Sequence, residues 1–142
     1  MTMTKRPFAD ALEKLRAVGL RPTRQRLALA RLLFENGDRH LTAETLYEEA
    51  QAAEIRVSLA TIYNSLHQFT EAGLLREVAV GASRTYFDTN VSDHHHFYYE
   101  DCGRLVDIAG GDVTVDCLTQ APDGTEIARV EVIIRVAGTP AA

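Results

Sequence analysis

The stretch that decides the fold is SLATIYNSLHQFTEAGLLREVAVGASRTYFD, residues 58–88. Its first half predicts an amphipathic helix, because Ser58 is suited to cap the start and Gly73 follows the expected end near Ala72. Its second half contains two short extended runs around a Gly-Ala-Ser turn, which predicts a β-hairpin. A helix that leads directly into a two-stranded ribbon is typical of the winged helix-turn-helix pattern.

Three further helices are predicted upstream of this stretch. One covers residues 8–18 and ends at Gly19, and Thr23 and Thr42 are suited to cap the other two. Apolar residues recur along these segments at spacings of three and four, which places them on one face of each helix. Together with residues 58–87, these helices predict a winged-helix DNA-binding domain over residues 1–87.

The pattern changes after Asp88. Residues 94–100 and 105–108 predict short strands, residues 112–120 a short helix despite their β-branched side chains, and residues 127–136 a longer strand in which apolar and polar residues alternate. The expected fold class is α+β, with the winged helix followed by a small α/β metal-binding and dimerisation domain over residues 88–142. A unit of roughly 50 residues buries a thin core by itself, so two copies are expected to pair through this sheet.

Composition and charge limit the classes of function that the protein can have. The residues are 46% hydrophobic and 25% charged, no apolar run approaches a membrane span, and the first residues lack the apolar core of a signal peptide. The net charge is −5, yet residues 1–40 carry +5 and residues 41–142 carry −10. This asymmetry indicates an end that faces a polyanion, although ordinary charge scatter explains it equally well. The protein is expected in the cytoplasm, with no membrane partner.

The helix expected after Ser58 has the composition of a DNA reader. None of the fourteen residues 57–70 is formally charged. The expected buried stripe consists of Leu59, Ile62, Leu66 and Phe69, and the small, polar face opposite it carries Ala60, Thr61, Asn64, Ser65 and Gln68. Asn and Gln bond adenine, Thr and Ala methyl groups pack on thymine, and no arginine is placed to read guanine, so A·T-rich double-stranded DNA is expected. The candidate base readers are Ala60, Thr61, Asn64 and Gln68, with phosphate contacts from Arg21, Arg24, Arg26 and Arg31. The alternative is an amphipathic helix of a protein-binding module.

Three consecutive histidines lie in SDHHHFYYEDCG, residues 92–103. In a strand, His94 and His96 share one face and His95 points to the other. Asp88 and Asp93 precede them and Asp107 follows, and nitrogen and oxygen donors without thiolate suit Fe(II), Mn(II) or Zn(II). The alternative is a solvated histidine cluster. Cys102 and Cys117 lack the partners of a zinc site and are expected to be free thiols.

Several segments together resemble the Fur superfamily of metal-responsive bacterial repressors, over residues 8–136. They are RPTRQR (21–26), LATIYNSLHQFTEAGLL (59–75) and TYFDTNVSDHHHFYYEDCGRLVDI (85–108). Within the superfamily, GDRHLTAETLYEEA (37–50), SLATIYNSLHQFTEAG (58–73) and YFDTNVSDHHHF (86–97) look most like the iron response regulator branch, Irr, which couples haem status to iron homeostasis. The peroxide-sensing PerR branch is the near neighbour.

The resemblance implies functional residues by position. The family's regulatory metal site matches His40, Asp88, His94, His96 and Asp107. Its reading-helix tyrosine matches Tyr63, and Asn64 stands where arginine is common. Tyr99 occupies the first position of the family's first CxxC pair, so no structural zinc is expected. A Cys-Pro haem motif is missing, so any haem sensing falls to His94, His95 and His96.

The expected function is therefore a homodimeric transcriptional regulator of iron and haem homeostasis. It responds to a divalent metal, Fe2+ or Mn2+ with Zn2+ able to substitute in vitro, or to haem, and it binds A·T-rich inverted repeats. It is not expected to be an enzyme. Two alternatives remain open: a peroxide-sensing PerR-like repressor, and a mononuclear non-haem iron enzyme, because two histidines and a carboxylate also form the facial triad of oxygenases.

Overall fold

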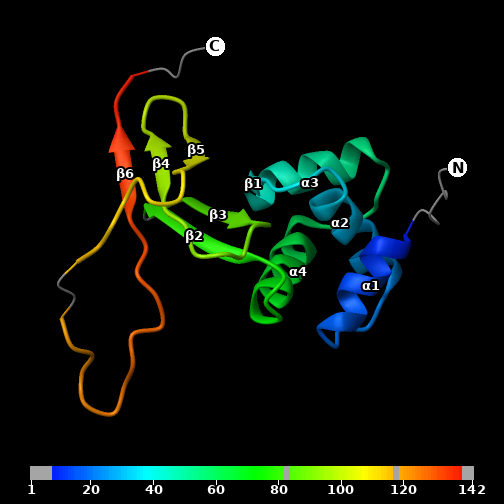
Figure 1. Cartoon of the computed structure of the whole chain (residues 1–142). Coiled ribbons are helices and arrows are strands. Elements are labelled where there is room, and N and C mark those ends of the chain that lie inside the picture. The colour runs from blue at the N-terminus through cyan, green and yellow to red at the C-terminus, as the bar shows by residue number, and fades with distance from the viewer. Residues whose placement is uncertain (1–7, 82–83, 117–118, 139–142) are drawn as a thin grey trace, which may run out of the picture. The chain divides into compact units, whose positions relative to one another are not determined.

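The computed structural model of the chain describes residues 8–81, 84–116 and 119–138 (Figure 1). The chain forms two compact units, Met1–Val91 and Ser92–Ala142. The first unit holds the helices and one sheet, and the second holds a separate sheet.

The predicted helices of the first unit are all present. They are α1 (Ala9–Ala17), α2 (Arg24–Phe34), α3 (Ala43–Ala52) and α4 (Leu59–Glu71). The three predicted caps are confirmed: Thr23, Thr42 and Ser58 each accept a hydrogen bond from the backbone N–H three residues later, at 3.1–3.2 Å. These bonds satisfy backbone donors that the first turn of each helix leaves open.

Gly73 ends α4 and turns the chain into the hairpin. Its φ is +87°, a region that side chains disfavour, and the Leu74 N–H donates to the Phe69 carbonyl at 2.9 Å. The Gly73 N–H donates to the Thr70 carbonyl at 3.0 Å, which completes a Schellman motif. The position of α4 is therefore fixed at both ends by local hydrogen bonds.

The helices of the first unit enclose one apolar core. Leu15, Leu29, Leu33, Leu46, Ile62, Leu66 and Phe69 are fully buried in it. Two predictions about α4 were wrong. Leu59 is 36% exposed instead of buried, because a side chain in the first turn points back past the start of the helix. Ser65 is buried instead of exposed, because it lies three residues from Ile62 and four from Phe69, on the core face.

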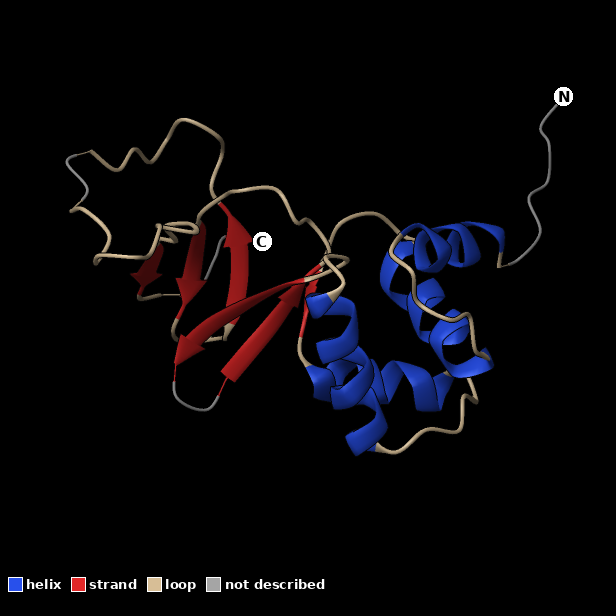
Figure 2. Cartoon of the chain, turned by 90° about the horizontal axis from the view of Figure 1, so that it is seen from below, coloured by secondary structure: helices blue, strands red, loops and turns tan. Residues whose placement is uncertain are grey.

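The sheet of the first unit has the order β1-β3-β2, with antiparallel neighbours. The hairpin of β2 (Arg76–Gly81) and β3 (Arg84–Asp88) is confirmed, and it projects from the helices (Figure 2). The third strand, β1 (His40–Leu41), was not predicted. It pairs with the end of β3 so that His40 lies opposite Asp88.

The second unit contains a three-stranded sheet in the order β5-β4-β6. Its strands are β4 (His96–Tyr99), β5 (Arg104–Asp107) and β6 (Ile133–Val136). β4 and β5 are antiparallel and place His96 opposite Asp107, whereas β4 and β6 are parallel. Among its described residues only His96, Tyr98, Leu105 and Ile108 are buried, so the core of this unit is as thin as expected.

Two predictions for the second unit were wrong. Residues 112–116 and 119–120 are not helical, in keeping with the β-branched side chains at Val113, Thr114 and Val115. The predicted strand over 127–136 is reduced to β6, because β4 begins at His96 and offers pairing only to residues 132–136. In the described part of the chain, no helix has the length and apolar character needed to cross a membrane.

Candidate functional site

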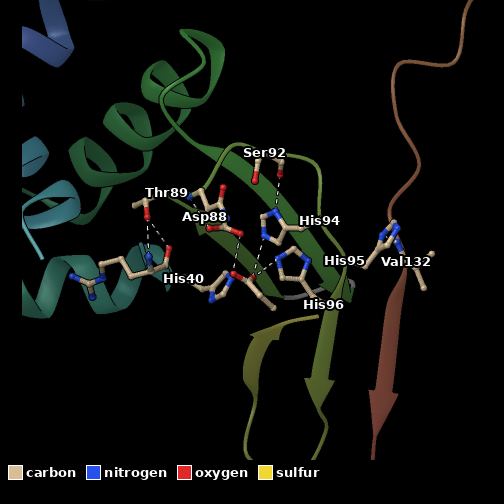
Figure 3. Close-up of polar contacts among 11 residues, drawn as sticks. His40, Asp88, Thr89, Ser92, His94, His95, His96 and Val132 are labelled. Atoms are coloured by element: carbon tan, nitrogen blue, oxygen red, sulfur yellow. Dashed lines mark hydrogen bonds and ion pairs between the residues drawn. The ribbon is translucent and has the colours of Figure 1, made fainter. Parts of the chain in front are cut away.

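The first unit contains one pair of candidate metal ligands, His40 and Asp88. The β1–β3 register brings them together, with His40 Nε2 3.2 Å from Asp88 Oδ2 (Figure 3). Asp88 is only 1% exposed, and its Oδ1 accepts a hydrogen bond from the Asn90 N–H at 2.9 Å. We refer to His40 and Asp88 as the N-terminal half-site.

Arg39 ties this half-site to α3 and to the end of β3. Its N–H donates to Thr89 Oγ1 at 2.8 Å, and the Thr89 N–H donates to the Arg39 carbonyl at 3.0 Å. Its guanidinium donates to both carboxylate oxygens of Glu49 on α3, at 2.9 and 2.5 Å. The hydrogen bond with Glu49 raises the pKa of Arg39. A shift of His40 or Asp88 would therefore disturb contacts that hold α3.

The second unit contains three more candidate ligands, His94, His96 and Asp107. His94 Nε2 and His96 Nε2 lie 3.1 and 3.3 Å from the same oxygen, Asp107 Oδ1 (Figure 3). Their ligand atoms lie within 4.8 Å of one another, and the two imidazole ring centres are 4.4 Å apart. We refer to these three residues as the C-terminal half-site.

The tautomer of His94 suits a metal ligand. Its Nδ1 lies 2.6 Å from the Ser92 carbonyl oxygen, which only accepts, so Nδ1 carries a proton and donates. In the neutral ring, Nε2 then holds a lone pair that faces Asp107. A lone pair and a carboxylate repel each other unless a proton or a metal cation lies between them. A histidine that donates its other N–H to a backbone carbonyl is also the usual arrangement at metal sites.

His95 has the opposite tautomer. The Val132 N–H donates to its Nδ1 at 3.0 Å, so the proton of the neutral ring lies on Nε2 (Figure 3). The predicted alternation is confirmed in its geometry, because His95 is turned toward Val132 and away from the Asp107 side. Its protonated Nε2 has no lone pair for iron, and moving the proton to Nδ1 would break the Val132 bond. This geometry weighs against the predicted haem contact at His95.

The exposed face of α4 differs in part from the predicted one. Ala60, Tyr63, Asn64 and Gln68 are exposed as expected for a DNA reader. Thr61 is half-buried, and its hydroxyl lies 3.0 Å from that of Ser58 in the helix cap. His67 is exposed on the same face and was missed, although its place three and four residues after Asn64 and Tyr63 could have indicated it.

Tyr63 is held by a residue outside α4. Its hydroxyl donates to Glu44 Oε1 on α3 at 2.5 Å. The pKa of Glu44 is lowered, chiefly by this hydrogen bond and then by a backbone hydrogen bond. The same contact raises the pKa of Tyr63. At neutral pH the tyrosine therefore keeps its proton and the glutamate is ionised.

Gln68 is held by Arg26 of α2. Arg26 Nη2 donates to Gln68 Oε1 at 3.0 Å, and its Nη1 donates to the Arg21 carbonyl at 3.0 Å. Because a guanidinium only donates, the side-chain oxygen of Gln68 faces Arg26 and its NH₂ group is left for other partners. Arg26 thus positions the side chain of Gln68. The sequence had predicted only a phosphate contact for Arg26.

The other candidate phosphate contacts lie near the start of α2. Arg21 and Arg24 are exposed there. Arg31, considered with them because of its charge, pairs with Glu35 at 3.0 Å and lies over the Phe8 ring at 5.2 Å. Arg24 is therefore better placed than Arg31 for a partner in solution.

The sequence matches the model of the ferric uptake regulator family over residues 17–134. The chain belongs to the ferric uptake regulator family. The predicted resemblance to the Fur superfamily is thereby confirmed, and the chain is a metal-responsive transcription regulator by family. Its assignment to the Irr branch stays a prediction.

Two relatives of this Fur-family chain carry names that refer to peroxide. The peroxide operon regulator of Bacillus subtilis (strain 168) is 38% identical over 105 residues, which are 74% of this chain and 72% of that protein. The peroxide-responsive repressor PerR of Staphylococcus aureus is 37% identical over 98 residues, which are 69% of this chain and 66% of that protein.

Solved structures of ferric uptake regulators share the fold. The regulator from Pseudomonas aeruginosa with manganese has a TM-score of 0.68 at 23% identity, covering 92% of this chain and 98% of that one. The regulator from Vibrio cholerae also has a TM-score of 0.68, at 20% identity, covering 89% and 98% of the two chains. The predicted winged helix with a small second domain is therefore confirmed as a fold.

Cys102 is the one cysteine among the described residues of this Fur-family chain. It is an exposed free thiol, and Cys117 lies outside the described residues. Tyr99 lies in β4, at the position where the resemblance places the first cysteine of a zinc-binding pair. These residues do not fit a structural zinc of the two-CxxC type.

Proposed function

We propose that this protein is a dimeric transcription regulator that binds one regulatory divalent cation per chain and reads DNA with α4. The observation that carries the proposal is the pair of half-sites. In each, strand register sets a histidine opposite an aspartate: His40 opposite Asp88, and His96 opposite Asp107. Each half-site offers too few ligands for a five- or six-coordinate ion by itself, and the two together offer five.

The donor set fits Fe(II), Mn(II) or Zn(II). It consists of three imidazole nitrogens and two carboxylates, and no thiolate takes part. His94, His96 and Asp107 already converge within their unit, and the tautomer of His94 leaves a lone pair toward Asp107. In the proposed role, His40 and Asp88 supply the remaining ligands from the winged-helix unit.

An ion shared by both half-sites would connect metal binding to DNA binding. The five candidate ligands are divided between the two compact units, so they bind one ion only in some relative orientations of the units. The ion stabilises those orientations, and DNA selects among them by the separation of the two reading helices in the dimer. Such differential binding is the thermodynamic requirement for allosteric control.

We infer that α4 contacts bases through Ala60, Tyr63, Asn64 and Gln68, with His67 added from the structure. Arg21 and Arg24 supply phosphate contacts that set the register. The exposed face of α4 from Leu59 to Thr70 bears no formal charge, which supports a helix that lies in a groove. An A·T-rich inverted repeat matches both this side-chain set and a two-fold dimer.

Peroxide is the first candidate signal, because the names of both relatives described above refer to it. His40, Asp88, His94, His96 and Asp107 would hold the ion, and Fe(II) there would supply one electron for the reduction of peroxide, which Mn(II) would not supply. Iron and haem status is the second candidate, favoured by the likeness of residues 37–50, 58–73 and 86–97 to the Irr branch. Within that candidate, the tautomer of His95 favours iron over haem as the bound species.

DNA binding by the full chain, measured by fluorescence anisotropy, tests these proposals. The protein is loaded with Mn(II) or, without oxygen, with Fe(II), and each sample is then treated with peroxide. Loss of DNA binding only in the Fe(II) sample supports peroxide sensing. Binding that follows Fe(II) concentration and resists peroxide supports iron sensing, and a haem titration forms a third arm. DNA affinity that is the same with and without metal would refute the regulatory proposal.

The iron enzyme is disfavoured, because members of this family are transcription regulators. Its test is direct: the Fe(II)-loaded protein is supplied with oxygen, and multiple turnovers of oxygen consumption per chain would support an enzyme. We expect at most a single stoichiometric reaction with the bound metal.

A further inference from the structure

We propose that Glu44 holds the hydroxyl hydrogen of Tyr63, so that Tyr63 can only accept hydrogen bonds from DNA. Tyr63 then selects bases that present an amino group in the major groove. Glu44 lies on α3 and has the role of a positioning residue for a side chain of α4. This inference rests on the proposed DNA-reading role of α4.

The contact between the two residues leaves only acceptors. A tyrosine hydroxyl has one hydrogen to donate, and Tyr63 donates it to Glu44 Oε1 at 2.5 Å. Its oxygen then offers lone pairs, and an ionised carboxylate also only accepts. Both side chains are exposed and belong to the same compact unit, so they present one acceptor-only surface beside α4.

The charge states that this surface needs are the ones present at neutral pH. The hydrogen bond from Tyr63 lowers the pKa of Glu44, and Glu44 raises the pKa of Tyr63. Glu44 also lies in the first turn of α3, where the helix dipole stabilises a negative charge. The hydroxyl hydrogen therefore stays directed at Glu44.

An acceptor-only surface discriminates among base edges. In the major groove, adenine N6 and cytosine N4 donate, whereas thymine O4, guanine O6 and the purine N7 atoms accept. Tyr63 and Glu44 together attract an amino group and repel a carbonyl oxygen at the same place. They also repel phosphate, so Tyr63 would be a base reader and not a backbone anchor.

Selection from a randomised duplex pool, with the Mn(II)-loaded full chain, tests the inference. The wild type is compared with Tyr63→Phe, Glu44→Gln and the control Glu48→Gln. Glu48 is an exposed acid one turn further along α3, so its variant removes the same charge without the contact to Tyr63. In each half of the DNA operator, we expect one position at which the wild type prefers adenine or cytosine. The preference should be about three- to tenfold, which corresponds to one net hydrogen bond.

Tyr63→Phe and Glu44→Gln should both weaken the preference at that same position, while Glu48→Gln should keep it. Both glutamine variants should bind all DNA more tightly at low salt. Replacing the selected adenine by purine, which lacks the 6-amino group, should weaken wild-type binding by the same factor and leave Tyr63→Phe unchanged. Glu44→Gln with base preferences equal to those of Glu48→Gln would overturn the inference. A wild type without any base preference would instead refute the reading role of α4 itself.

Discussion

His94 and His95, neighbours in the sequence, have different tautomers. His94 donates from Nδ1 to the Ser92 carbonyl, whereas His95 accepts at Nδ1 from the Val132 N–H. Only the first arrangement puts a lone pair on Nε2, where a metal could bind. The difference arises because backbone groups on opposite sides of the chain face the two rings: a carbonyl meets one ring and an amide the other.

This division predicts the metal affinities of three variants. His94→Ala and His96→Ala should weaken Mn(II) binding by more than the roughly 10–100-fold that loss of an outer hydrogen-bond partner costs, because each removes a ligand. His95→Ala should leave Mn(II) affinity nearly unchanged. Isothermal titration of the single variants measures this. Equal loss of affinity in all three would mean that the histidines act as one cluster.

The face of α4 predicts two kinds of DNA phenotype. Asn64→Ala should relax base preference, at about 1–3 kcal/mol for a bidentate contact. Arg24→Ala should weaken binding to all sequences alike and lower the slope of affinity against salt by about one ion. Binding assays over a salt series separate the two effects. Equal loss of specificity in both variants would contradict the assigned roles.

Residue-scale prediction from sequence succeeded where spacing decides the answer. His94 and His96 both contact Asp107 and His95 contacts Val132, as the alternation predicted, although β4 begins only at His96 and not at the predicted His94. The contacts of Glu44 with Tyr63 and of Arg26 with Gln68 were not predicted. Each contact joins residues on two different helices, 19 positions apart in the first pair and 42 in the second. Their meeting depends on how the helices pack, which periodicity does not reveal.

At the scale of single elements, the caps make the sharpest prediction. Ser58 accepts from the Thr61 N–H at 3.1 Å and fixes the start of α4. Ser58→Ala should lower the free energy of unfolding by about 1 kcal/mol, within a range of roughly 0.5–2 kcal/mol for helix caps. Urea denaturation followed by circular dichroism measures it. Ser58→Asp is the matched control, since aspartate also caps, and it should retain most of the stability. Equal stability of the alanine variant and the wild type would show that the cap is unimportant.

The helices were predictable because caps, apolar spacing and terminal glycines agreed along each segment. The errors fall where tertiary pairing decides. β1 has two residues, too few for any periodic signal, yet it places His40 opposite Asp88. The strand expected over 127–136 is short because its partner β4 has four residues. Alternating apolar and polar residues show that a segment can form a strand, but they do not show how long the neighbouring strand is.

At the scale of the whole molecule, the thin core of the second unit predicts dimerisation through β6. Ile134 is 37% exposed on this edge strand. Ile134→Asp would place an unpaired charge in the proposed interface, at a cost of about 3–5 kcal/mol in association. Sedimentation at low micromolar concentration should show monomers, while the control Ile134→Val stays dimeric. A dimeric Ile134→Asp variant would place the interface elsewhere.

The central claim is that one cation joins the two half-sites and thereby controls DNA binding. The most direct test is the effect of Mn(II) on the DNA affinity of the wild type and of two variants, Asp88→Asn and Asp107→Asn, one from each half-site. We predict that Mn(II) tightens wild-type DNA binding by about 5–150-fold, the usual range of allosteric coupling, and that either variant abolishes the effect. A variant that retains the full Mn(II) effect, or a wild type whose DNA affinity is unchanged by Mn(II), would contradict the account.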